Sequence, residues 1–469
     1  MSEVNPREPA DLRIDGGTLV VPGQGLLRAG VAIRSGKIAA VGLEKALPPA
    51  EEVIDAAGLH VFPGVIDPHV HFGLRDNFAV GARMDLDLRS ETPAALAGGV
   101  TTIGTLIRER GSYLDKVPGH IEDVERESSA DIFFSLWWNE PVHLEEAGRC
   151  ARAFGITSFK MYMYGVPGSV PSAEDGFLLE GFRRGASLGQ RALVAIHAEN
   201  PHMVEWGDRA LRKRQKTSKR KMTLADWSDR HPDEAEGEAV QRAVYFASLA
   251  GCRLYIVHLS TAMACRRLRE LRKGRDHVTV ETTSPYLSID KTHPAGFLAK
   301  MTPPFRAPED REVLWEGIRE GVIDTVGTDS APRTLDQKNP KGGLFGSKGA
   351  FPAVETHFPV LLTEGFHRRG IPLHVLAAKT SLGPARAYGL YPRKGTFLPG
   401  ADADLVLVDL NKTWKVRLKD LHSKAGFSLY EGKTLRGKPV VTVKTGKIVF
   451  DHGRVLAEPG SGSYLRRSL

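Results

Sequence analysis

Both ends of the chain carry short apolar runs separated by turn residues. Residues 10–59 contain LRIDGGTLVVPG, GVAIRSGKIAAVG and EEVIDAAG, and the same texture returns near the other end in GADADLVLVDL and KPVVTVKTGKIVFDHGRV. Glycine-punctuated apolar runs of this length are typical of β-hairpins. We therefore predict that residues 1–61 and 388–455 together form one small β-sandwich domain, followed by a C-terminal tail over 456–469.

The middle of the chain alternates apolar strand-like runs with helical patterns such as TPAALAGG and DREVLWEGIREG, which is typical of a parallel α/β core. The predicted strands are residues 62–72, 99–106, 131–138, 156–162, 192–198, 253–260, 277–283 and 323–329. Eight strands with helices between them predict a (β/α)8 TIM barrel over residues 62–387. The barrel would be inserted between the two halves of the sandwich.

Composition is that of an ordinary enzyme with large buried cores: 469 residues are 41% hydrophobic, with 49 glycines and 29 prolines. No run approaches the ~18 apolar residues that cross a bilayer, and MSEVNPREPADLRIDGG lacks the apolar core of a signal peptide. Three widely spaced cysteines, Cys150, Cys252 and Cys265, give neither a disulfide framework nor a cysteine-rich zinc cluster. We expect a cytoplasmic protein without a membrane partner.

Charge changes this picture only locally. The chain has 64 Lys and Arg against 56 Asp and Glu, a net charge of +8, and part of the excess lies in RALRKRQKTSKRK, from Arg209 to Lys221. Such a run can bind nucleic acid or another anion, but it is more often a solvated helix and loop. No aromatic residue interleaves with it, which weakens a single-strand binding role. We expect no nucleic-acid partner; salt-dependent affinity would reveal one.

The candidate chemistry begins with VIDPHVHFG, in which one residue separates His69 from His71. In a strand, residues i and i+2 point to the same face, so both imidazoles would lie side by side. Neutral imidazole is the commonest side-chain ligand of transition metals. The alternative is a pair of strand histidines that bond backbone carbonyls, and the rest of the chain must decide.

Further polar side chains stand at or near the carboxyl ends of other predicted strands: Lys160 in the fourth, His197 in the fifth, His258 in the sixth and Asp329 in the eighth. Active sites of this barrel lie at that face. His71 and Lys160 are about three βα units of ~30 residues apart, which supports the register. Four histidines and an aspartate that converge on one barrel mouth indicate a metal site rather than core packing.

These residues resemble the cyclic amidohydrolases of the amidohydrolase superfamily, which include hydantoinases, dihydropyrimidinases, allantoinases and dihydroorotases. The resemblance covers nearly the whole chain. Its markers are FPGVIDPHVHF, AGGVTTI, GITSFKMYMYG, AIHAEN, PDEAEGEAVQRA, YIVHLST, MTPPFRAPEDREVLWEGIREGVIDTVGTD and KGTFLPGADADLVLVD. The hydantoinase branch is the most similar, particularly over Met301–Asp329.

The resemblance implies two divalent ions, zinc first, with manganese, iron or cobalt as alternatives that the same ligand types accept. The implied ligands are His69, His71 and Asp329 for the first ion, His197 and His258 for the second, and Lys160 as the bridge. An ammonium has no lone pair to offer a metal, so Lys160 would react with carbon dioxide and become N6-carboxylysine. A surface or salt-bridged lysine is the alternative, which the apolar neighbours in ITSFKMYMY disfavour.

The activity implied is that of a hydrolase that opens the C–N bond of a cyclic amide or imide by attack of a metal-bridging hydroxide. Asp329 would act as base and then as acid. Tyr164 matches the family tyrosine that hydrogen-bonds the developing oxyanion, with a packed aromatic beside Tyr162 as the alternative. Ser284, in ETTSPYLSID, matches a hydantoinase residue whose backbone contacts the ring amide. The resemblance also implies a homo-oligomer, a dimer or a homotetramer.

Three departures from the family pattern concern the substrate. Gly73 stands where dihydroorotases carry the arginine that grips the substrate carboxylate, and Arg75 is out of register. Ser330 replaces the usual histidine after the strand-eight aspartate, and Gly349 falls near the hydantoinase substrate asparagine. The metal positions are therefore intact while the residues around the substrate are altered. We expect the opening of a cyclic amide or imide ring that does not depend on a substrate carboxylate, and a substrate other than plain hydantoin or dihydropyrimidine stays open as an alternative.

Several readings of the function stay open at this point. The first is a hydantoinase/dihydropyrimidinase-like enzyme, and the alternative is an allantoinase-like or other cyclic amide or imide hydrolase, with dihydroorotase disfavoured. A catalytically inactive relative that serves as a scaffold is a different class of protein. Retention of all six ligand positions argues against that scaffold role.

Overall fold

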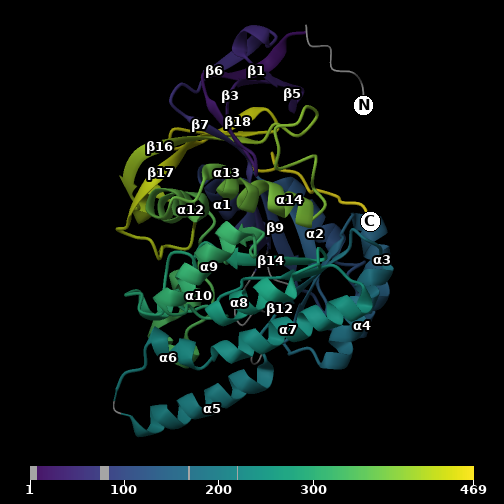
Figure 1. Cartoon of the computed structure of the whole chain (residues 1–469), viewed down its shortest axis with the longest axis vertical. Coiled ribbons are helices and arrows are strands. Elements are labelled where there is room, and N and C mark those ends of the chain that lie inside the picture. Colours follow the sequence, from purple (N-terminus) through teal and green to yellow (C-terminus); the bar gives the residue numbers. More distant parts are fainter. Residues whose placement is uncertain (1–7, 74–83, 167–169, 219) are drawn as a thin grey trace.

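The computed structural model describes residues 8–73, 84–166, 170–218 and 220–469. Three sheets organise it: an eight-stranded sheet from the middle of the chain, and a four-stranded and a seven-stranded sheet from the two chain ends. Figure 1 shows the purple and yellow chain ends together above the barrel, whose strands and helices are blue to green. No helix in these described ranges is long and apolar enough to cross a membrane.

The eight-stranded sheet is the barrel, and its neighbouring strands pair in parallel in chain order. Its strands are β8 (Val65–Val70), β9 (Val100–Ile107), β10 (Asp131–Trp137), β11 (Ser158–Tyr162), β12 (Leu193–His197), β13 (Leu254–Ile256), β14 (Val278–Thr283) and β15 (Thr325–Gly327). The sheet closes where His71 N donates to Ser330 O at 2.8 Å, next to a parallel bridge between Val70 and Ser330. The predicted (β/α)8 barrel is confirmed.

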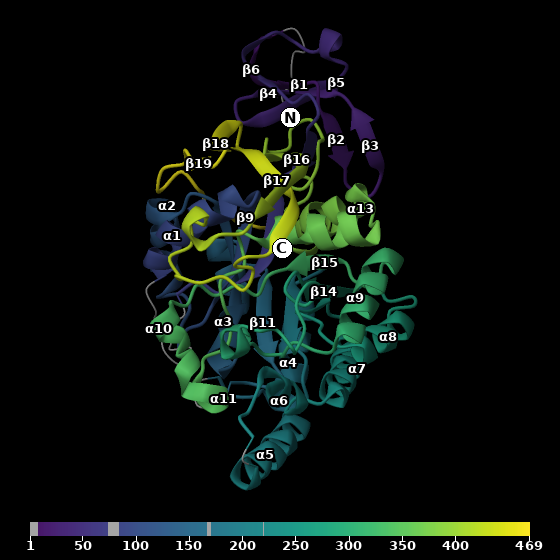
Figure 2. The ribbon, with the colours of Figure 1, turned by 90° about the vertical axis from the view of Figure 1, so that its left-hand side faces the viewer.

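Amphipathic helices surround the barrel and bury their apolar faces against it, as Val117 and Val124 do in the second of them. The long helices are α1 (Met84–Ala97), α2 (Val117–Glu127), α3 (Pro141–Phe154), α4 (Asp175–Ser187), α5 (Pro201–Thr217), α7 (Asp233–Ala250), α8 (Ala262–Leu271) and α9 (Pro308–Glu320). Shorter ones are α6 (Leu224–Asp229), α10 (Leu335–Lys338), α11 (Gly343–Gly346), α12 (His357–Leu361), α13 (Leu373–Ala377) and α14 (Gly383–Ala387). Figures 1 and 2 show α5 projecting from the end of the molecule opposite the sandwich.

The two chain ends share one sandwich, as predicted. Its strands are β1 (Ala10–Asp15), β2 (Thr18–Val21), β3 (Gly25–Arg28), β4 (Gly30–Arg34), β5 (Lys37–Gly42), β6 (Ala50–Asp55), β7 (His60–Pro63), β16 (Leu405–Lys415), β17 (Thr434–Lys444), β18 (Lys447–Asp451) and β19 (Arg454–Val455). β7 pairs antiparallel with β16, with Leu405 opposite Pro63, so the halves are joined by a sheet. Leu12, Leu405 and Val443 belong to the core between its sheets.

The run predicted as one strand over 62–72 is divided at Gly64. β7 belongs to the sandwich and β8 to the barrel, and between them Gly64 N donates to Asp404 O at 2.6 Å. A Cβ at Gly64 would lie 2.2 Å from Thr101 Oγ1, so only glycine fits this close approach. An apolar run that continues through such a glycine gives no sign of the change of sheet.

The C-terminal tail runs under the barrel, at the end opposite the strand carboxyl termini. Ile132 N donates to Ser463 O at 2.9 Å and Leu465 N to Ile132 O at 2.7 Å. Leu465 is fully buried, and Arg467 donates from Nη1 to Ser158 Oγ at 3.0 Å. The tail is thus part of the packed structure.

Candidate metal centre and substrate cavity

His69, His71 and Asp329 meet at the barrel mouth. His69 lies near the end of β8, His71 directly follows that strand, and the aspartate follows β15, where Asp329 N donates to His69 O at 2.9 Å. His71 Nε2 lies 2.9 Å and His69 Nε2 lies 3.4 Å from Asp329 Oδ1. Their ligand atoms all fall within 4.8 Å of one another, and all three residues are buried. Two imidazoles and a carboxylate in this arrangement fit a divalent transition metal.

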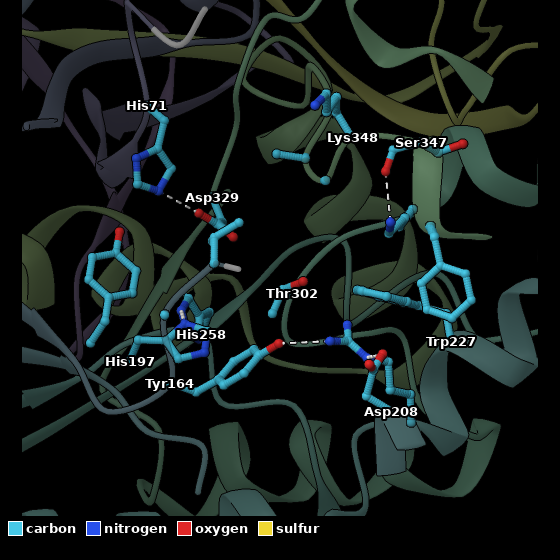
Figure 3. A pocket seen from close by; sticks show the side chains of 18 of the residues that line it. His71, Tyr164, His197, Asp208, Trp227, His258, Thr302, Asp329, Ser347 and Lys348 are labelled. Carbon is cyan, nitrogen blue, oxygen red and sulfur yellow. Dashed lines mark hydrogen bonds and ion pairs between the residues drawn. The ribbon is translucent and has the colours of Figure 1, made fainter. Parts of the chain in front are cut away.

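His197 and His258 form a second pair beside the first. His197 Nδ1 lies 2.9 Å from His258 Nε2, and the His258 ring stacks on the His69 ring with centroids 5.4 Å apart. His258 and Asp329 both have a positive φ, 40° and 54°, which non-glycine residues rarely adopt and which is characteristic of functional sites. Figure 3 shows the labelled His71, Asp329, His197 and His258 grouped at one end of the cavity.

Lys160 lies beside His69 and is buried, as its apolar neighbours indicated. Its Nζ is 3.3 Å from His69 Nε2, and the side chain is 3% exposed. The alternative of a surface lysine is therefore wrong. Burial lowers the pKa of the Lys160 ammonium to about 8, so the neutral amine is accessible near physiological pH.

Two buried carboxylates orient the histidines from behind. Glu281 Oε1 lies 2.8 Å from His69 Nδ1, and Glu199 Oε2 lies 2.8 Å from His197 Nε2. The other Glu199 oxygen accepts from His231 Nδ1 at 2.8 Å. Carboxylates of this kind fix the tautomer and direction of metal-binding imidazoles. Sequence reasoning missed both, although Glu199, two residues after His197 on the same side of the chain, could have been found from AIHAEN.

Electrostatics favour the protonation states that bind metal. Burial lowers the pKa of His69, His71 and His258, so these rings are neutral and keep a lone pair. Burial alone would raise the pKa of Asp329, but His69 and His71 beside it lower that pKa to about 2. A metal ion binds neutral imidazole and ionised carboxylate, so these side chains need not lose a proton when the metal binds.

A cavity of about 370 Å³ opens from this centre. Tyr164 lines it, is 5% exposed, and its hydroxyl oxygen accepts a hydrogen bond from Arg230 Nη2 at 3.0 Å. Burial raises the pKa of Tyr164 to about 12, so it remains a hydroxyl that can donate. The position of Tyr164 in the cavity wall agrees with the predicted contact between Tyr164 and the substrate. Packing beside Tyr162, the alternative, does not explain the hydrogen bond that Arg230 donates to Tyr164.

Ser284 is placed differently from Tyr164. Its N donates to Gly327 O at 3.0 Å, its Oγ lies 2.8 Å from His357 Nδ1, and its carbonyl accepts from Ser288 Oγ at 2.7 Å. It is not among the residues that line the cavity in the described part of the chain. The contact between the Ser284 backbone and a ring amide stays a prediction.

The three departures from the family pattern have structural correlates. Gly73 has a φ of 74°, which suits glycine better than an arginine, and Arg75 lies outside the described residues. Ser330 is buried and its Oγ accepts from Ala353 N at 3.0 Å. Gly349 lines the cavity.

The basic segment Arg209–Lys221 is mainly a solvated helix end, as expected. Arg214 and Arg220 both form ion pairs with Asp226, and several of its other side chains are exposed on α5. Arg212 is the exception, because it lines the mouth of the cavity and its guanidinium lies 4.0 Å from the Phe345 ring centroid.

Four more cavity residues escaped sequence reasoning: Arg108, Trp227, Arg230 and Lys300. Arg108 directly follows β9, so the strand-end rule that found the histidines would have found it. The others lie in irregular segments or a short helix, where no periodicity marks a cavity side chain.

A (β/α)8 barrel with histidines and an aspartate at its mouth defines a class of metal-dependent hydrolases. The Amidohydrolase family pattern matches residues 257–449. An allantoinase of Rubrobacter xylanophilus is 36% identical over 475 residues, 97% of each chain, and an L-hydantoinase of Paenarthrobacter aurescens is 31% identical over 459 residues, 96% of each chain. The solved L-hydantoinase (dihydropyrimidinase) from Arthrobacter aurescens superposes with a TM-score of 0.88 at 29% identity, covering 98% of this chain and 100% of that one. The chain therefore belongs to the amidohydrolase family.

Proposed function

We propose that this protein opens a cyclic amide or imide ring by metal-dependent hydrolysis, in the manner of a hydantoinase or dihydropyrimidinase. The observation that carries the proposal is the meeting of His69, His71 and Asp329 within 4.8 Å at the mouth of the barrel. The names of the relatives, hydantoinase and allantoinase, support the choice of a ring amide as the substrate.

Two divalent ions, zinc first, would be held by the six predicted ligands. Lys160 becomes a ligand when its neutral amine attacks carbon dioxide, forms an N–C bond and loses one proton to give a carbamate with anionic oxygens. Its buried Nζ, with a pKa lowered to about 8 by burial, suits that reaction. When bound, the ions would lower the pKa of a water molecule and polarise the carbonyl group.

Two side chains would handle protons and charge during ring opening. Asp329, which is ionised and lies 2.9 Å from His71, would accept a proton from the attacking water and pass it to the leaving ring nitrogen. Tyr164 would donate to the carbonyl oxygen as negative charge develops there. The bond from Arg230 occupies the tyrosine oxygen as an acceptor and leaves the O–H to be directed at the substrate.

An allantoinase-like activity is the second candidate. The allantoinase relative has a higher identity than the L-hydantoinase, 36% against 31%. Gly349, near the position of the hydantoinase substrate asparagine in the resemblance, also leaves the recognition of a plain hydantoin incomplete.

The experiment is a panel of hydantoin, dihydrouracil, allantoin, dihydroorotate and succinimide, tested on metal-replete protein, with His71→Ala as the inactive control. We expect ring opening of at least one compound and loss of it after chelation. A native protein that opens none of them, with metal bound, would overturn the proposal. Cytoplasmic location and a homo-oligomer remain predictions, which fractionation and light scattering would test.

A further inference from the structure

His231 is a fully buried histidine outside the predicted ligand set, and both of its ring nitrogens have polar partners. Its Nδ1 lies 2.8 Å from Glu199 Oε1, and its Nε2 lies 3.4 Å from Arg230 Nη1. A neutral imidazole donates from one nitrogen and accepts at the other, whereas an ionised carboxylate only accepts and a guanidinium only donates. The ring proton of His231 therefore stands on Nδ1, and the ring connects Glu199 on one side with Arg230 on the other.

The surroundings of His231 keep the ring neutral and fix its orientation. Burial lowers the pKa of His231 to about 4, although the Glu199 carboxylate beside it acts in the opposite direction. Arg306 Nη2 lies 3.8 Å from Glu199 Oε1, and Arg306 Nη1 donates to the His231 carbonyl. The Trp227 ring packs against the imidazole, with centroids 5.0 Å apart. The imidazole is thus held on several sides.

On one side, His231 reaches the second pair of candidate metal ligands through Glu199. The carboxylate accepts from His231 through Oε1 and from His197 through Oε2, both at 2.8 Å. With its proton on Nε2, His197 keeps a lone pair on Nδ1, the nitrogen that lies 2.9 Å from His258 Nε2. A carboxylate in this position orients a metal-binding imidazole. Loss of the His231 donor would remove the hydrogen bond that holds Glu199 Oε1.

On the other side, His231 reaches Tyr164 through Arg230. The guanidinium donates from Nη2 to the Tyr164 hydroxyl oxygen at 3.0 Å and from Nη1 to His231 Nε2. The Tyr164 and His231 rings also meet edge to face, with centroids 5.6 Å apart. In Figure 3 the Tyr164 hydroxyl points away from His197. The position of that hydroxyl therefore depends on the same imidazole that holds Glu199.

We propose that His231 is a positioning residue of the ring-opening reaction, which sets the direction of His197 through Glu199 and that of the Tyr164 hydroxyl through Arg230. The metal-binding imidazole and the oxyanion donor would then keep a fixed separation, because one rigid ring holds both. This inference rests on the proposed function and deepens it. His231 bonds Glu199 and Arg230 rather than a predicted metal ligand, so its role is to position other groups.

The test uses two variants that each keep one half of the imidazole. The amide of asparagine ends near the position of Nδ1, and that of glutamine ends near the position of Nε2. His231→Asn should therefore keep the bond to Glu199 and lose the one to Arg230, and His231→Gln should do the reverse. His231→Leu loses both bonds, and His202→Leu, at an exposed histidine of α5, is the control.

Two measurements separate the halves: zinc affinity, by competition with a chelator in bicarbonate buffer, and kcat of zinc-saturated protein with a ring compound that the native enzyme opens. Groups that orient metal ligands contribute roughly 10- to 100-fold, so His231→Gln should weaken zinc binding by that factor and keep kcat close to native. His231→Asn should keep the zinc affinity and lower kcat about tenfold, an effect that should vanish in the Tyr164→Phe background. His231→Leu should show both losses and His202→Leu neither.

The outcomes also separate this proposal from the proposed function. A histidine that only packs the core would change both measurements together, so parallel losses in His231→Asn and His231→Gln, or no loss in either, would overturn the positioning role. If the native protein opens no ring, the proposed function fails and the zinc affinities still decide. A loss in His231→Gln that His231→Asn does not share supports the role, and equal affinities overturn it. Thermal unfolding checks that both polar variants are folded.

Discussion

Arg230 donates from Nη2 to the hydroxyl oxygen of Tyr164 at 3.0 Å, and the two residues are 66 positions apart in the chain. The same guanidinium lies 2.8 Å from Asp208 and packs over the Trp227 ring, with 4.5 Å to its centroid. Arg230 thus holds the tyrosine from outside the metal centre and leaves the tyrosine proton available.

From this hydrogen bond we expect Tyr164 and Arg230 to act as a coupled pair. Tyr164→Phe should lower kcat about 10²-fold or more, in line with loss of an oxyanion donor, with little change in metal content. Arg230→Met should lower kcat less, and its effect should largely vanish in the Tyr164→Phe background, because it acts through that hydroxyl. Steady-state kinetics of the four proteins, with exposed Tyr245→Phe as control, measure this. Fully additive losses would contradict the coupling.

Lys160→Ala should empty the metal centre. Purified native protein should carry close to two divalent ions per chain by elemental analysis, and the variant should lose most of them because the bridging anion is gone. A short carboxylic acid added to the variant should restore part of the activity by filling the gap beside His69. Wild-type turnover and metal content in Lys160→Ala would rule out the bridging role.

Reloading of metal-free protein should depend on pH through Lys160. Only the neutral amine reacts with carbon dioxide, and burial lowers the pKa of Lys160 to about 8, so the neutral fraction grows as pH rises through that value. At fixed dissolved carbon dioxide and zinc, the reactivation rate should rise about tenfold per pH unit below pH 8 and level off above it. Stopped-time activity assays follow the rate. A rate independent of pH and of carbon dioxide would disagree with carboxylation.

Asp329→Asn separates metal binding from proton transfer. The amide keeps the size and one oxygen but cannot accept a proton, and positioned proton transfer contributes roughly 10²–10⁴-fold in rate. We expect near-complete loss of kcat, while the ion held by His197, His258 and Lys160 stays bound. Turnover and metal content measured on one preparation decide the matter, and activity within a few-fold of native would assign the proton to another group.

The barrel, and the meeting of the candidate ligands at its mouth, could be predicted from the sequence because both depend on local signals. Apolar runs bounded by turns mark the strands, and a polar residue at a strand's carboxyl end, such as His197, points into the mouth by topology alone. The division of the run at Gly64 could not be predicted, because the residue that requires a glycine there, Thr101, lies on the next barrel strand. The positions of Lys300 and Arg230 in the cavity could not be predicted either, because they depend on tertiary contacts with Trp227.

The pairing of β7 with β16 also sets an order for biosynthesis. Leu405 lies opposite Pro63, and 342 residues separate them (405 minus 63), which a ribosome adds in roughly 20 to 70 seconds at ~5–20 residues per second. During that interval β7 presents an open strand edge. Its residues Val61 and Phe62, which are buried in the finished protein, can then contact other nascent chains. We therefore expect the yield of soluble protein to depend on how this edge is protected. A chaperone could cover it, or translation could slow after the barrel has emerged.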